Sequence, residues 1–133
     1  FVTGTTNQLD LSGNDIPLSP TFTATLGASY RFDVGFGTIE PQAQIYFSDS
    51  YFTNEFNYDA GISGRDVGRQ GSYTKSDASI TYRTPDETFF VQGFVRNIEN
   101  EAVLNRTVIG GGGAIFQNYG PPRTYGVRAG FRF

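Results

Sequence analysis

Strict alternation of apolar and polar residues is the feature that most constrains what this chain can fold into. Near its end, Tyr125, Val127, Ala129, Phe131 and Phe133 occupy every second position. The positions between them are polar, charged or glycine. Successive side chains of a strand point to opposite faces, so this stretch predicts a strand with one apolar and one polar face.

The same alternation recurs along the chain. It is regular in TFTATLGASYRF, TIEPQAQIYFS and SYTKSDASITYR, where Pro41 weakens the second stretch. It is less regular in TFFVQGFVRNI, because phenylalanines fall on both faces. We expect strands over about 20–32, 36–48, 72–83, 88–100 and 123–133.

Composition excludes several kinds of function. The 133 residues carry a net charge of -3 and contain no His and no Cys. This removes thiolate metal sites, histidine-based triads and a basic nucleic-acid surface. Glu99 and Glu101 share a strand face, but no other catalytic groups surround them to form an acid–base site. The glycines 110–113 are not followed by the Gly-Lys-Ser that a phosphate-binding loop requires. We expect no enzyme activity, no cofactor, no metal and no nucleic-acid partner.

The connections are unequal in length. Short turns near 33–37 and 84–87 alternate with long loops at about 1–19, 49–71 and 110–122. Outer-membrane barrels show this asymmetry, with short periplasmic turns and long extracellular loops. The fold class expected is therefore all-β, an antiparallel transmembrane β-barrel. Five strands cannot close such a barrel, so we expect the chain to be a piece of a longer precursor.

Two stretches also resemble a known family. YGPPRTYGVRAGFRF is similar to the C-terminus of TonB-dependent outer-membrane receptors. Residues 72–104 resemble the penultimate hairpin of that family at Pro85, Asp86, Asn97, Ile98 and Asn100. The tyrosine that usually follows is replaced here by AVL at 102–104.

The resemblance implies the C-terminal five strands of a 22-stranded barrel in a Gram-negative outer membrane, with the N-terminal plug absent from this chain. It implies active import of a scarce ligand of the siderophore-iron, vitamin or oligosaccharide type. The implied partners are outer-membrane lipid, the rest of the barrel and plug, TonB, and the barrel-assembly machinery. That machinery would read Tyr125, Val127, Ala129, Phe131 and Phe133 as its signal, by strand addition.

The long loops carry aromatic, amide and guanidinium side chains of the kind that small-molecule sites use. The candidates for ligand contact are Tyr51, Phe52, Asn54, Phe56, Tyr58, Arg65, Arg69, Phe116, Asn118 and Tyr119. A second interpretation places Tyr51 and Phe52 in an aromatic girdle and leaves the other residues solvated. Charged residues of the polar faces would line a substrate path, pack against a plug or solvate the wall.

Two alternatives to active import remain open. A passive outer-membrane porin shares the strand pattern and the terminal phenylalanine. A soluble β-sandwich binding module shares the alternation, although it has no reason to gather all its long loops at one end.

Overall fold

The computed structural model describes residues 10–57 and 67–132, and these residues form strands and turns. It contains two compact units. The wall unit is Phe22–Ser48, Tyr73–Ala102 and Pro121–Phe133, and the loop unit is Phe1–Thr21, Asp49–Ser72 and Val103–Gly120. Within the described ranges, no helix is long and apolar enough to cross a membrane.

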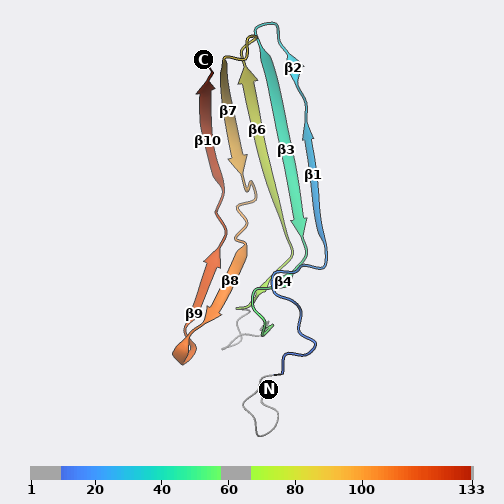
Figure 1. The fold of residues 1–133 in the computed structure, drawn as a ribbon, viewed down its shortest axis with the longest axis vertical. Helices are drawn as coiled ribbons and strands as arrows, with labels where there is room; N and C mark the ends of the chain where they lie inside the picture. The colour runs from blue at the N-terminus through green and yellow to red at the C-terminus, as the bar shows by residue number, and fades with distance from the viewer. Residues whose placement is uncertain (1–9, 58–66, 133) are drawn as a thin grey trace. The chain divides into compact units, whose positions relative to one another are not determined.

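The wall unit is one antiparallel sheet (Figure 1). Its strands are β1 (Thr23–Ser29), β2 (Phe32–Asp33), β3 (Thr38–Ser48), β6 (Tyr73–Arg83), β7 (Phe89–Arg96) and β10 (Thr124–Phe131). They pair in the order β1-β3-β6-β7-β10, with β2 on β3. Within the described part of the chain, the outer edges of β1 and β10 have no partner, so the sheet is open at both sides. Unpaired edges cannot face lipid, so a membrane-spanning wall needs further strands to close it.

The strand register gathers the apolar residues on one face. Ala28 pairs with Ala43, Ala43 with Ala78, and Ala78 with Val95. The apolar face comprises Ala24, Leu26, Ala28, Ile39, Pro41, Ala43, Ile45, Phe47, Ala78, Ile80, Tyr82, Phe89, Val91, Gly93, Val95, Tyr125, Val127, Ala129 and Phe131. Many of these side chains are exposed in this chain, among them Leu26, Ile80 and Val127. A broad exposed apolar face is what a barrel turns toward lipid.

Aromatic rings mark both ends of the apolar face. Phe22 and Phe47 lie 6.1 Å apart between ring centroids at the end where β3 leaves the sheet. At the tight-turn end, Tyr30 and Phe32 lie 4.5 Å apart, and Phe36 lies 6.1 Å from Tyr82. Such rings are enriched at the two membrane–water interfaces of barrels.

The irregular alternation of β7 has a packing reason. Phe90 and Phe94 lie on the polar face, opposite Gly130 and Gly126 of β10. A Cβ at Gly126 would stand 3.1 Å from the Phe94 ring, and one at Gly130 would collide with Phe90. Each ring therefore covers a glycine of the neighbouring strand, and these two phenylalanines do not belong to the apolar face.

Tight turns join the strands at one end of the sheet. Val34 N–H donates to Gly37 O at 2.9 Å, and Thr84 N–H donates to Phe89 O at 3.0 Å. Gly37 has φ 148°, and a Cβ there would strike the Arg83 carbonyl and the Tyr82 ring. Only glycine fits that position.

A corner at Asn97 ends β7. Asn97 is 2% exposed and has φ 54°, which is left-handed and ends the ladder. Its amide donates to Glu101 O at 3.0 Å and Pro121 O at 3.2 Å, and its oxygen accepts from Glu101 N at 2.9 Å. The side chain thus ties the chain leaving β7 to the chain approaching β10.

The loop unit contains two small ladders. One pairs β4 (Tyr51–Phe52) with β5 (Arg69–Gln70), and the other pairs β8 (Leu104–Ile109) with β9 (Ile115–Tyr119). A 3₁₀ turn at Gly111–Gly113 joins the second pair. The small buried core of the loop unit consists of Val67, Val103 and Leu104. Leu104 N–H donates to Gln70 Oε1 at 2.5 Å, and Thr107 Oγ1 donates to Val67 O at 2.6 Å.

Four expected stretches need correction. The strand expected over 20–32 is interrupted at Tyr30 and Arg31, between β1 and β2. The strand expected over 88–100 stops at Arg96, because Asn97 turns left-handed. The stretch expected as a loop at 49–71 contains β4 and β5, which pair with each other. The stretch expected as a loop at 110–122 contains β9, which pairs with β8 across a glycine turn.

Candidate functional site

Two of the loop residues predicted to contact ligand form hydrogen bonds with backbone groups of the loop unit. Asn54 is 8% exposed, and its side-chain oxygen accepts from Phe56 N–H at 3.0 Å. Tyr51 is half-buried, and its hydroxyl donates to Leu104 O at 3.3 Å. Their polar atoms serve the loop unit's own backbone.

In the loop unit, the exposed Arg69 lies beside the half-buried Phe52. The Arg69 guanidinium lies 5.9 Å from the Phe52 ring centroid and donates to Ser50 Oγ at 3.2 Å. Both border a hollow of about 400 Å³ together with Tyr51, Asn14 and Asp15. This hollow joins an aromatic wall to one cation and one carboxylate, a combination suited to an aromatic solute that carries polar groups.

A second hollow of about 220 Å³ brings Phe56 to Arg106, with Asn54 and Thr107 in its lining. Arg106 was not among the sequence candidates. In the sequence it stands in the polar run Asn105-Arg106-Thr107 within LNRTVI, which by itself does not distinguish a site from a solvated strand.

The remaining loop candidates lie on β9 or outside the described residues. Phe116 is 63% exposed and Tyr119 50% exposed, and the Tyr119 hydroxyl donates to Gln117 Oε1 at 3.1 Å. Asn118 is also exposed. Tyr58 and Arg65 lie outside the described residues, as does Phe133 of the predicted assembly signal.

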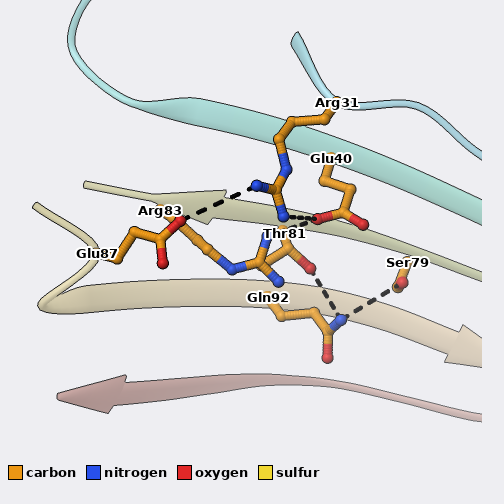
Figure 2. Close-up of polar contacts among 7 residues, drawn as sticks. All are labelled: Arg31, Glu40, Ser79, Thr81, Arg83, Glu87 and Gln92. Atoms are coloured by element: carbon orange, nitrogen blue, oxygen red, sulfur yellow. Dashed lines mark hydrogen bonds and ion pairs between the residues drawn. The ribbon is translucent and has the colours of Figure 1, made fainter. Parts of the chain in front are cut away.

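The polar face of the wall contains a charge-compensated cluster near the tight turns (Figure 2). Glu40 binds Arg83 at 2.6 Å and Arg31 at 3.4 Å, and Arg31 lies 4.0 Å from Glu87. Beside it, the Gln92 amide donates to Thr81 Oγ1 at 2.9 Å and Ser79 Oγ at 3.5 Å. The charges and amides of this cluster partner one another across β3, β6 and β7.

Further along the same face, Phe94 lies beside two arginines, Arg96 of its own strand and Arg128 of β10. The Arg96 guanidinium is 5.6 Å from the Phe94 ring centroid, and that of Arg128 is 5.0 Å away. They border a hollow of about 270 Å³ with Gln42, Gln44 and Asp77. In the described part of the chain, neither guanidinium has an ion-pair partner.

Four of the five residues predicted as an assembly signal lie on the edge strand β10. Tyr125, Val127 and Phe131 are 82%, 74% and 64% exposed on the apolar face, and Ala129 shares that face. An edge strand with exposed alternate side chains has the form that strand addition uses.

Comparison with solved structures identifies the fold. The chain superposes on the ferric yersiniabactin uptake receptor FyuA from Yersinia pestis with a TM-score of 0.76 and 18% identity, over 90% of this chain and 17% of that one. It superposes on BauA, the ferric preacinetobactin receptor from Acinetobacter baumannii, with a TM-score of 0.62 and 21% identity, over 90% and 16%. The chain thus spans about a sixth of the length of either receptor.

Comparison of the sequence with protein-family models and with curated proteins gives no match. The barrel fold implied by the resemblance is confirmed by the two structures: the chain folds as an unclosed part of the β-barrel found in receptors of this kind.

Proposed function

We propose that this chain forms part of the wall and the extracellular loops of a TonB-dependent outer-membrane receptor, and that the whole receptor imports a ferric-siderophore type of ligand. The observation that carries the proposal is the two-faced sheet, which superposes over 90% of the chain on a ferric yersiniabactin receptor. Its apolar face is bounded by aromatic rings at both ends, as a lipid-facing wall requires.

The wall performs no chemistry in this proposal. Its apolar face meets lipid, and its polar face lines the barrel interior. The loop unit presents Arg69, Phe56, Phe116, Asn118 and Tyr119 to the outside, where a ligand first binds. The exposed arginines suit an anionic ferric complex, because guanidinium groups bind carboxylates and other oxyanions bidentately.

Edge strand β10 supports a second part of the proposal. Its exposed residues Tyr125, Val127, Ala129 and Phe131, together with Phe133, act as the signal for the barrel-assembly machinery. The open edge supplies backbone groups for strand addition, and the alternate side chains supply specificity.

The test is energy-dependent uptake by the full-length protein that contains this chain. Cells expressing it would be given ⁵⁵Fe-yersiniabactin and ⁵⁵Fe-preacinetobactin, with and without an uncoupler and in a strain lacking TonB. We expect uptake of a ferric siderophore that stops in the absence of TonB. Permeation that is unaffected by the loss of TonB and by the uncoupler would instead indicate a passive channel.

A further inference from the structure

Four arginines of the wall unit, Arg31, Arg83, Arg96 and Arg128, fall into two groups. Arg31 and Arg83 are neutralised by Glu40, with Glu87 adding a contact at 4.0 Å. Arg96 and Arg128 have no ion pair and no side-chain hydrogen bond among the residues that the structure describes. Within the described residues, one pair of guanidinium groups thus has carboxylate partners and the other pair has none.

The open pair is arranged around an aromatic ring. Both guanidinium groups lie within 6 Å of the Phe94 centroid, at 5.6 and 5.0 Å, which is the range of cation–π attraction. The ring can cover β10 because position 126 is glycine, where a Cβ would come within 3.1 Å of it. Phe94 is therefore in cation–π range of both planar cations, one from β7 and one from β10.

The surrounding hollow of about 270 Å³ is amide-rich. Gln42 and Gln44 border it, and neither side chain has a hydrogen-bond partner within the described residues. Asp77 also borders it, and one of its oxygens accepts from Asn97 N–H at 2.9 Å. The Asp77 carboxylate offsets one of the two guanidinium charges, so the lining retains a net charge of one positive unit.

We infer that the Arg96–Phe94–Arg128 cluster is an oxyanion site that binds a carboxylate. A planar carboxylate matches the guanidinium fork and would supply the missing negative charge. The two unpaired glutamine amides provide further donors at the border. The carboxylate comes either from a solute or from an Asp or Glu side chain elsewhere in the complete receptor, and the chemistry of recognition is the same.

This inference rests on the proposed function in one respect, namely that the polar face lies inside a closed barrel. The experiment therefore uses the purified full-length receptor in detergent and checks each sample for heat-modifiable gel migration. A sample without a heat-modifiable barrel contradicts the proposed function. A folded barrel without an oxyanion site contradicts only this inference.

The first measurement is the rate of modification by phenylglyoxal, which reacts with arginine side chains, read at each residue by peptide mass spectrometry. Succinate is the probe carboxylate, and sodium chloride at equal ionic strength is the control for screening. If a solute fills the site, Arg96 and Arg128 are modified several-fold more slowly in succinate than in chloride. Arg83, already paired with Glu40, serves as the internal control and shows no such change.

The second measurement distinguishes the two sources of the carboxylate. In the Arg128→Lys variant, a water-soluble carbodiimide links the new amine to any carboxylate that touches it. A cross-link from position 128 to an Asp or Glu other than Asp77, with slow and succinate-insensitive modification in the unaltered protein, identifies a side chain of the receptor as the occupant.

Other outcomes overturn the inference. Fast modification of Arg96 and Arg128 that succinate does not slow would show that the cluster binds no carboxylate. Slow modification without any cross-link would show that the arginines are covered by something other than an anion. A cross-link to Asp77 alone would mean that the cluster neutralises itself.

Discussion

The wall unit and the loop unit are stabilised in different ways. The wall is held by main-chain ladders along β1, β3, β6, β7 and β10, and most of its large apolar side chains are exposed. The loop unit has short ladders, but Val67, Val103 and Leu104 are buried and side chains bond to backbone groups distant in sequence. Within this chain the apolar face of the wall therefore stays uncovered, whereas the loop unit has its own small interior.

The Asn97 corner tests how far the wall depends on a single side chain. Replacing Asn97 with Ala removes three hydrogen bonds and places Ala in a left-handed conformation, at a cost of about 3 kcal/mol in unfolding free energy. Denaturant titration of the full-length protein in lipid vesicles measures this loss. Asn97→Gly is the control, since it relieves the backbone strain and should recover only part of the stability. Equal stability of Asn97→Ala and the unaltered protein would refute the role of the corner.

The two faces of β3 test the lipid contact directly. Ile45 lies on the apolar face and Gln44, its neighbour in sequence, on the polar face. Ile45→Arg places a charge in hydrocarbon and should destabilise the inserted barrel by about 2 kcal/mol. Gln44→Arg adds the same side chain to the polar face and should cost far less. Equal losses in vesicle-based unfolding would mean that the apolar face does not meet lipid.

The interior of the loop unit is tested at Gln70. Gln70→Ala leaves the buried Leu104 N–H without its acceptor, which costs the loop unit about 1 kcal/mol. Hydrogen exchange at the Leu104 amide should then be about fivefold faster, with wall amides unchanged. Arg69→Ala, one residue away on the exposed side of β5, serves as the control and should leave this amide protected.

The smallest expected effect is in the β6–β7 turn. The hydroxyl of Thr84, and then the hydroxyl and N–H of Thr88, hydrogen-bond to Asp86 and lower the pKa of its carboxyl. Because the folded pKa is lower than the unfolded one, this stabilisation is present above the unfolded pKa and is lost as pH falls through the folded pKa. In acid titrations of unfolding, Asp86→Asn should be slightly less stable at neutral pH and should converge with the unaltered protein at low pH. A difference that persists at low pH would show that the charge is not involved.

Alternation in the sequence was sufficient to predict most of the wall. It assigned Ile39, Ile45 and Val127 to one face, and the register places them there. It could not assign β7, where Phe90 and Phe94 share a face with polar residues. Each covers a glycine of β10, a pairing that depends on two strands separated by the β8–β9 excursion.

The candidate site was less accessible to sequence reasoning. Composition correctly marked the long loops as rich in aromatic and polar groups, but it did not separate inward from outward side chains. Asn54 and Tyr51 turn to backbone groups of the loop unit, while Arg69 and Phe116 remain exposed. The hairpin formed by β8 and β9 was not predicted, because its two short strands flank a run of four glycines that is typical of an open loop.

What the sequence by itself determined is local: which residues alternate, where glycine and proline interrupt a strand, and which chemistry the absence of His and Cys removes. These follow from side-chain direction and backbone preference within a few residues. Only the tertiary structure decided that Arg83 is paired with Glu40 while Arg96 and Arg128 are left open around Phe94. Whether a charge is compensated depends on the cross-strand register between distant segments. The alternation along one strand does not determine that register.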